Sequence, residues 1–282
     1  MNQEEKRPTP KRYLALYFAL TLPLAWLFWI PMALIQRGIW TPPVPIPMLV
    51  WSTLGAVSPL IALSIIERVS GGEVKLQAIL DQIRLRAGRT PWTLASPAII
   101  FGIHLLMTVS YFGVAACQGA DPGPLRFFNP EVFATLGGWI LLIMPVHFFS
   151  ALLTSPFFEE PGWRGFAFEQ LGYYVPRDVA SLIVGSYWWL WHQGMNAAFD
   201  LAPTPYSYLA MLLDSFAIDA LYTLSGRNLL AAMLAHQAMG TAFIFLLPLP
   251  NLWYLLAIKL AAVAALRYQI HRREIGVGAY AF

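Results

Sequence analysis

Long apolar blocks separated by short polar segments are the dominant feature of this sequence. A helix needs about 20 mostly apolar residues to cross the hydrocarbon core of a bilayer. Eight blocks near that length can be delimited, at 13–36, 48–66, 92–117, 133–156, 179–198, 206–224, 228–247 and 252–267. Their apolar residues do not follow the alternating or 3.6-residue spacing of soluble folds. The pattern predicts an all-α, polytopic integral membrane protein with about eight transmembrane helices.

The composition agrees with a membrane protein and excludes several other classes. Hydrophobic residues make up 58% of the 282 residues and charged residues only 12%, whereas soluble domains average about 25% charged residues. Cys117 is the only cysteine, which excludes an intramolecular disulfide and a cysteine-rich metal cluster. The net charge of +3 comes without a basic cluster interleaved with aromatic residues, so we expect no nucleic-acid partner.

The first block follows the basic segment KRPTPKR, as the core of a signal peptide would. Because this block is longer than a signal-peptide core and no clear cleavage site follows it, we expect a retained helix. The predicted organisation is an N-terminal tail at 1–12, a membrane domain of eight helices with an embedded cavity at 13–267, and a C-terminal tail at 268–282.

The lysines and arginines predict the orientation in the membrane, because short cytoplasmic loops are enriched in them. With the N-terminus inside, fifteen fall in inner segments and two in outer loops, so we expect both termini in the cytoplasm. The inner set is Lys6, Arg7, Lys11, Arg12, Arg68, Lys75, Arg84, Arg86, Arg89, Arg164, Arg177, Arg227, Arg267, Arg272 and Arg273, and the outer set is Arg37 and Arg126. The inner segment 67–90 also carries a helical apolar stripe at Leu76, Ile79, Leu80 and Ile83 and is expected along the inner headgroups.

Several ionisable residues lie within the apolar blocks, where they are costly and normally face the interior of the helix bundle or a cavity. They are His104, His147, His192, His236, Asp214, Asp219 and Lys259. For His104 and His147 we expect hydrogen-bonded packing rather than a ligand role. The two aspartates and Lys259 can form a structural ion pair between the sixth and eighth blocks, or either aspartate can act in catalysis.

Glu159, Glu160, His192 and His236 form a set with a common chemistry. Hydrolysis of a peptide bond inside a membrane requires an activated water, a base for its proton and a group that stabilises the oxyanion. Glutamate and neutral histidine supply the base directly, or they bind Zn²⁺, which lowers the pKa of bound water towards ~7. One carboxylate and two imidazoles leave the fourth zinc position to water. The alternative is a surface salt bridge and two unrelated packing histidines.

The two glutamates begin the segment EEPGWRG, which also holds Arg164. Arg164 follows Glu160 by four residues, so on a helix the two share a face and can form an ion pair. That pair would hold one carboxylate ionised and leave Glu159 for chemistry. Pro161 favours the first turn of a helix. Either a new short helix begins here, with the glutamates at its N-terminal end, or Pro161 and Gly162 kink a continuous helix.

Three segments resemble the signature motifs of the CPBP family, which comprises CAAX prenyl proteases and bacteriocin-processing or self-immunity enzymes. EEPGWRG (159–165) matches the first motif, E-E-x3-R, in full at Glu159, Glu160 and Arg164. WWLWH (188–192) matches the second motif, F-x3-H, at His192, with Trp188 in place of the phenylalanine. The motifs occur between 159 and 240 in the family's order, and the eight-helix layout extends the likeness over the chain.

The third motif, H-x3-N or H-x3-D, is matched in LLAAMLAHQAMG (229–240) at His236 but has Gly240 in its last position. A glycine offers no side-chain donor, and the loss of one oxyanion donor costs about 10²–10³ in rate. Asn196 could supply an amide donor from the neighbouring helix instead, or Asp219 could project into the same cavity. The alternative is that the protein has lost efficient catalysis and acts by binding a peptide or partner.

The resemblance implies an intramembrane endopeptidase with an all-helical core and a catalytic cavity reached from the cytoplasmic side. Glu159 and His192 would activate water, His236 would serve the oxyanion, and Glu160 and Arg164 complete the expected catalytic set. For a metalloprotease, Glu159, His192 and His236 are the expected Zn²⁺ ligands, and no organic cofactor is implied. The expected partners are membrane lipid and a membrane-associated peptide or protein substrate, in a bacterial or archaeal cell membrane. A transporter is a further alternative, although no internal symmetry of the kind found in such folds is visible.

Overall fold

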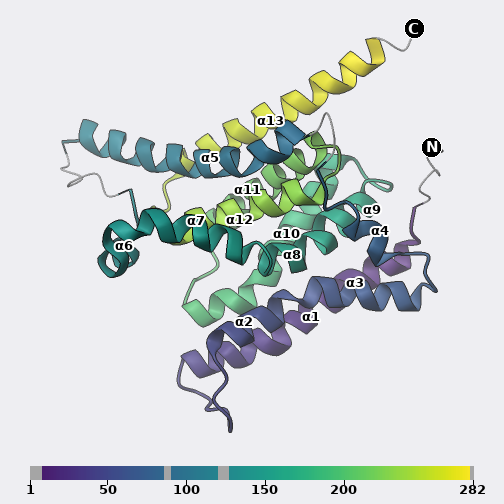
Figure 1. The fold of residues 1–282 in the computed structure, drawn as a ribbon, viewed down its shortest axis with the longest axis horizontal. Coiled ribbons are helices and arrows are strands. Elements are labelled where there is room, and N and C mark those ends of the chain that lie inside the picture. The colour runs from purple at the N-terminus through teal and green to yellow at the C-terminus, as the bar shows by residue number, and fades with distance from the viewer. Residues whose placement is uncertain (1–7, 86–89, 120–126, 280–282) are drawn as a thin grey trace. The chain divides into compact units, whose positions relative to one another are not determined.

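The fold comes from a computed structural model, which describes residues 8–85, 90–119 and 127–279 and, within 274–279, the backbone alone. The regular elements in these ranges are helices (Figure 1), and an isolated β-bridge joins Phe128 and Leu246. In chain order the elements are α1 (Lys11–Gln36), α2 (Met48–Ala56), α3 (Ser58–Val69), α4 (Leu76–Leu80), α5 (Thr90–Cys117), α6 (Pro130–Leu136), η1 (Gly137–Trp139), α7 (Ile140–Ala151), α8 (Ser155–Glu160), η2 (Pro161–Phe168), α9 (Glu169–Leu171), α10 (Arg177–Asn196), η3 (Ala197–Phe199), α11 (Pro205–Leu224), α12 (Leu229–Phe245) and α13 (Trp253–Ala279).

The described residues contain six helical segments that are long and apolar enough to cross a membrane: Lys11–Gln36, Met48–Val69, Thr90–Cys117, Pro130–Leu171, Pro205–Leu224 and Trp253–Arg273. They confirm the predicted all-α integral membrane protein, with six such segments against the predicted eight. The other two predicted spans correspond to α12, which is apolar but shorter, and α10, which carries Arg177, Asp178 and several hydroxyl and amide side chains. The two predicted spans outside this set of six are therefore the two that carry the site histidines.

One predicted helix boundary and the predicted location of one arginine differ from those in the structure. Helix α13 continues to Ala279, beyond the predicted end of the last span at 267. Arg164, counted among the inner charges, lies within a helix and is fully buried, so it carries no information about loop orientation. The predicted positions of Lys6, Arg7, Arg86, Arg89 and Arg126 lie outside the described residues. The orientation of the termini stays a prediction.

The chain divides into two compact units, of which the first comprises Met1–Ile83 and Phe157–Pro203. In this unit α1 packs against α2, α3 and α10 (Figure 1). Trp26 of α1 donates from Nε1 to the main-chain oxygen of Trp191 on α10 at 3.0 Å. A Cβ at Gly194 would lie only 2.7 Å from the same indole. The absence of a side chain at this position thus lets α1 approach the helix that carries His192.

The first motif lies on one continuous helical segment from Ser155 to Leu171, so Pro161 does not begin a new helix. Helix α8 passes directly into η2, a π-helix, and then into α9. Proline lacks an N–H and its ring crowds the carbonyl four residues earlier in an α-helix, and the wider π turn accommodates both features. All eight residues of η2 are buried, and π turns within α-helices are frequent at functional sites. Of the two predicted alternatives, the structure contains the continuous helix.

The segment 67–90, which is predicted to lie along the inner headgroups, packs partly on protein. Its helix α4 contacts η2, and Ile79 of the predicted apolar stripe is buried. Glu67 supports the start of α4, because its Oε1 accepts the main-chain N–H of Leu76 at 2.9 Å. Part of the stripe therefore covers the motif helix.

The second unit comprises Arg84–Pro156 and Thr204–Phe282. Its main packing pairs are α5 with α12 and α11 with α13 (Figure 1). Ser96 on α5 donates from Oγ to the main-chain oxygen of Ala231 on α12 at 3.0 Å. This contact between a small polar residue and a backbone carbonyl is typical of helix pairs in membranes.

A buried ion pair links α11 and α13, as the sequence predicts. Lys259 Nζ lies 2.6 Å from Asp214 Oδ2, which identifies Asp214 as the aspartate that pairs with this lysine. His104 Nε2 on α5 lies 3.6 Å from the other carboxylate oxygen, so this histidine packs beside the ion pair. His147 packs on the ring of Phe245 at a centroid distance of 5.3 Å, as expected for a packing role.

We predict that Gly162→Ala lowers thermal stability, because a Cβ at Gly162 would lie 2.3 Å from the Tyr17 hydroxyl and 2.9 Å from Pro59 Cβ. Tyr17 is fully buried and packs edge-on against Trp163, so it has little room to move. Overpacking of this kind costs about 1–3 kcal/mol. The control is Gly102→Ala on α5, where no heavy atom lies within 4 Å of the added Cβ. Thermal unfolding in detergent checks the pair; equal midpoints would contradict tight packing of η2.

Candidate active site

The second glutamate of the first motif forms a fully buried ion pair. Arg164 Nη1 lies 3.0 Å from Glu160 Oε1, and both side chains are 0% exposed. The predicted i,i+4 pair is therefore present, although the helix changes from α to π between its members. The Arg164 guanidinium also lies over the ring of Trp188, 5.2 Å from its centre. Such a cation–π contact on a desolvated arginine adds to the attraction of the carboxylate.

The first glutamate has partners of a different kind. Glu159 Oε2 accepts one hydrogen bond from Trp163 Nε1 at 3.3 Å and another from Trp188 Nε1 at 2.9 Å. Trp163 lies one turn later on the same helical segment, whereas Trp188 comes from α10. All three side chains are buried. An indole N–H only donates, so both tryptophans orient the carboxylate and neither can take a proton from it.

His192 is positioned by its own helix. Its Nδ1 lies 2.9 Å from the main-chain oxygen of Trp188, one turn earlier on α10. A carbonyl oxygen only accepts, so Nδ1 carries a proton and the lone pair of the neutral ring is on Nε2. The ring lies edge-on against Trp188 and Trp191, at centroid distances of 5.2 and 4.7 Å. His192 is therefore a half-buried imidazole with a fixed tautomer.

Two residues of this arrangement were absent from the site predicted by sequence. Trp163 follows Glu159 at the same four-residue spacing that predicted the Glu160–Arg164 pair, so the i,i+4 rule could have indicated it. Trp188 stands where the second motif has phenylalanine. Because an indole has an N–H and a phenyl ring does not, this difference could have indicated a hydrogen bond at this position. In the structure Trp188 contacts Glu159, Arg164 and His192.

His236, the histidine of the third motif, is buried on α12 in the second unit. Gly240 lies about one turn later on the same helix. Glu159 and His192 belong to the first unit. The predicted meeting of His236 with these two residues therefore stays a prediction.

The expected Zn²⁺ ligands include donor atoms of the kinds that zinc prefers. Within the described residues, no group of three or more His, Cys, Asp or Glu side chains is gathered in a way that could hold a metal ion. Individually, Glu159 and His192 offer a carboxylate oxygen and an imidazole nitrogen, both suited to Zn²⁺. The contact of His192 Nδ1 with a backbone carbonyl is also the outer contact that zinc-bound histidines usually make. Zinc binding stays a prediction.

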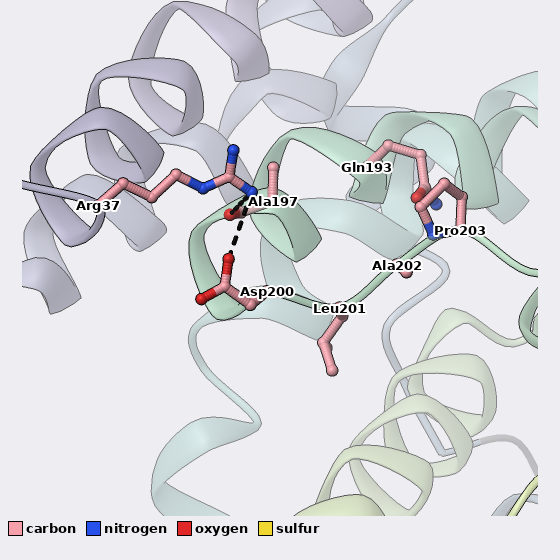
Figure 2. A pocket seen from close by; sticks show the side chains of 7 residues that line it. All are labelled: Arg37, Gln193, Ala197, Asp200, Leu201, Ala202 and Pro203. Atoms are coloured by element: carbon pink, nitrogen blue, oxygen red, sulfur yellow. Dashed lines mark hydrogen bonds and ion pairs between the residues drawn. The ribbon is translucent and has the colours of Figure 1, made fainter. Parts of the chain in front are cut away.

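A pocket of about 450 Å³ lies at the C-terminal end of α10 and includes none of the predicted site residues (Figure 2). It is lined by Arg37, Gln193, Ala197, Asp200, Leu201, Ala202 and Pro203. Figure 2 shows the Arg37 side chain reaching towards η3, where its Nη2 bonds Ala197 O at 3.0 Å and Asp200 Oδ1 at 3.3 Å. Exposed ion pairs contribute little to stability. The contact ties the end of α1 to the end of the helix that carries His192.

We predict that Arg164→Ala destabilises the protein strongly, because it removes the guanidinium from a fully buried carboxylate. Breaking a buried pair costs about 3–5 kcal/mol. The matched control is Arg177→Ala, whose pair with Glu169 has the same 3.0 Å distance but leaves the arginine 36% exposed. Exposed pairs contribute about 0–1 kcal/mol. Denaturant unfolding in mixed micelles measures both, and similar small losses would show that the Glu160 carboxylate does not depend on Arg164.

Comparison with protein families identifies part of the chain. Residues 140–242 match the family described as Rce1-like, type II CAAX prenyl endopeptidase Rce1-like. The matched range contains both glutamates, Arg164 and the two motif histidines. A search of curated proteins finds no match to the chain. The match confirms the resemblance to the CPBP family over this range and supports intramembrane endopeptidase activity in general. The chain is an integral membrane protein whose residues 140–242 match the Rce1-like type II CAAX prenyl endopeptidase family.

Proposed function

We propose that the chain is an intramembrane endopeptidase that hydrolyses a peptide bond of a membrane-associated substrate, with water activated by Glu159 and His192. The observation that carries the proposal is that one residue, Trp188, contacts both groups, through its indole N–H and its main-chain oxygen. A carboxylate and a neutral imidazole held by a common neighbour are the two kinds of side chain that most often act as general bases. The family match to residues 140–242 supports the reaction class.

In the proposed reaction Glu159 takes a proton from water, and the resulting hydroxide adds to the carbonyl carbon of the scissile bond. The proton then passes to the leaving amine as the C–N bond breaks, and a free carboxylate and a free amine result. His192 orients the water through Nε2, since Nδ1 is bonded to Trp188. His236 is proposed to donate to the oxyanion, where each such donor contributes about 10²–10³ in rate.

Glu160 and Arg164 have a different part in this proposal. Their side chains form a fully buried ion pair. Because the two charges neutralise each other, the substrate does not have to supply a charged partner for either. Arg164 also fixes the indole of Trp188 from its face. The pair is therefore assigned to holding the segment in place rather than to the transfer of a proton.

Zn²⁺ is the proposed cofactor where the enzyme is metal-assisted, and Glu159, His192 and His236 would hold it. When bound, the ion would supply a water whose pKa is lowered towards ~7. The donor atoms of Glu159 and His192 and the carbonyl contact of the imidazole suit this role. Metal analysis of the purified protein, with and without chelator treatment, tests the assignment independently of activity.

The proposed substrate is a peptide held at the membrane, and a prenylated CAAX peptide is the first to test because the matched family is described by that activity. The membrane helices of the chain would keep enzyme and substrate in the same layer. A second candidate function is peptide binding without cleavage. It is favoured by Gly240, which leaves the third motif without its amide or carboxylate side chain. A wild-type protein that binds the peptide in nanodiscs and does not cleave it would support this second function.

We predict that Glu159→Gln lowers the rate of peptide cleavage by about 10²–10⁴, the usual contribution of a general base. Full-length protein in nanodiscs and a fluorogenic farnesylated CAAX peptide provide the assay. The matched control is Glu169→Gln, which changes a carboxylate on the same helical segment that pairs with Arg177, the first residue of α10. It should keep activity within about threefold. Full activity of Glu159→Gln would contradict a base role for this residue.

A further inference from the structure

We infer that Trp188 is a positioning residue that holds Glu159 and His192 as one unit, an inference that rests on the proposed hydrolysis. Three groups of this residue make the contacts: the indole N–H, the ring face and the main-chain oxygen. Trp188 is fully buried, so none of these contacts has to compete with bulk water.

The indole N–H makes the shorter of the two bonds to Glu159. It lies 2.9 Å from Oε2, whereas the Trp163 bond to the same atom is 3.3 Å long. Hydrogen bonds to an ionised group are shorter and stronger than bonds between neutral groups. Because Trp188 is on α10 and Glu159 is on α8, this bond also fixes the carboxylate relative to the helix that carries His192.

The main-chain oxygen and the ring of Trp188 act on the histidine. The main-chain oxygen of Trp188 accepts a hydrogen bond from His192 Nδ1 at 2.9 Å. The lone pair of the imidazole is thereby on Nε2. The ring lies edge-on to the imidazole at 5.2 Å between centroids. A rotation of Trp188 about its side-chain bonds would therefore disturb the carboxylate bond and the packing of the imidazole together.

Arg164 contacts the face of the Trp188 indole. Its guanidinium carbon lies 5.2 Å from the ring centre, and the same guanidinium is held by Glu160. The first motif therefore positions Trp188, which in turn positions the two groups that are proposed to activate water.

The second motif makes this inference testable with a conservative change. Its pattern has phenylalanine where this chain has Trp188. Trp188→Phe keeps an aromatic face for Arg164 and the same main-chain oxygen for His192, and it removes the N–H that bonds Glu159. The matched control is Trp26→Phe on α1, because the Trp26 indole also donates one bond to α10, to the main-chain oxygen of Trp191 at 3.0 Å.

Steady-state kinetics on the full chain in nanodiscs, with the fluorogenic farnesylated CAAX peptide, is the first arm of the test. We expect Trp188→Phe to lower kcat by about 10–100-fold, as changes to residues that orient a catalytic group do, with KM within about twofold. Trp26→Phe should keep both constants within about twofold. Each variant loses one indole hydrogen bond, so a similar fall in Tm is expected for both.

Nuclear magnetic resonance of ¹⁵N-labelled indoles is the second arm and requires no substrate. We expect Glu159→Gln to shift the indole N–H resonances of Trp188 and Trp163 and to leave that of Trp191 in place, because only the first two donate to Glu159. If the Trp188 indole did not bond Glu159, its resonance would not respond selectively to this substitution.

The outcomes separate this inference from the proposed function. Wild-type kcat in Trp188→Phe, or an indole resonance of Trp188 that does not respond to Glu159→Gln, overturns the positioning role. A wild-type protein that cleaves no membrane peptide overturns the proposed function instead. In that case the indole response alone decides whether Trp188 holds Glu159: a selective shift supports the contact and no shift overturns it.

Discussion

Compensation of two adjacent buried carboxylates is the constraint on which the first unit depends. Glu159 and Glu160 are 1% and 0% exposed, and an ion moved out of water costs several kcal/mol unless protein groups replace its hydration. Glu160 receives a guanidinium and Glu159 receives two indole N–H groups. The two kinds of partner differ, because a guanidinium neutralises the charge of a carboxylate whereas indole N–H groups only solvate it. The difference supports the proposed division of roles, which is structural for Glu160 and chemical for Glu159.

The surrounding helices place these partners. Pro161 and the π turn that accommodates it keep the segment continuous, so that residues on both sides of the proline face the same interior. Gly162 allows Tyr17 of α1 to lie directly against this turn. The same helix α1 is joined to α10 by Trp26. Three segments distant in sequence are thereby held close enough for one indole of α10 to reach Glu159.

The sequence predicted the features that depend on local spacing. Continuous apolar blocks predicted the helices, and the four-residue spacing of Glu160 and Arg164 predicted their ion pair. It could not choose between the two roles of Pro161, because a first helical turn and a kinked helix satisfy the same proline rules. Nor could it choose between Asp214 and Asp219 as the partner of Lys259: five residues apart, they are rotated by about 140° on a helix, and the choice depends on how α13 packs. The indole bonds of Trp163 and Trp188 depend on side-chain rotamers, which apolar periodicity does not encode.

In the proposed function, the motif residues from 159 to 236 form one water-activating site. Cysteine cross-linking tests it most directly, because Cys117 is the only native cysteine and is exposed. In a Cys117→Ser background, His192→Cys and His236→Cys should be joined efficiently by a bifunctional methanethiosulfonate that spans less than roughly 10 Å, the reach of two groups that share a metal or a water. Each single variant is the control for intermolecular products. A pair that is joined only by much longer reagents would contradict a single site.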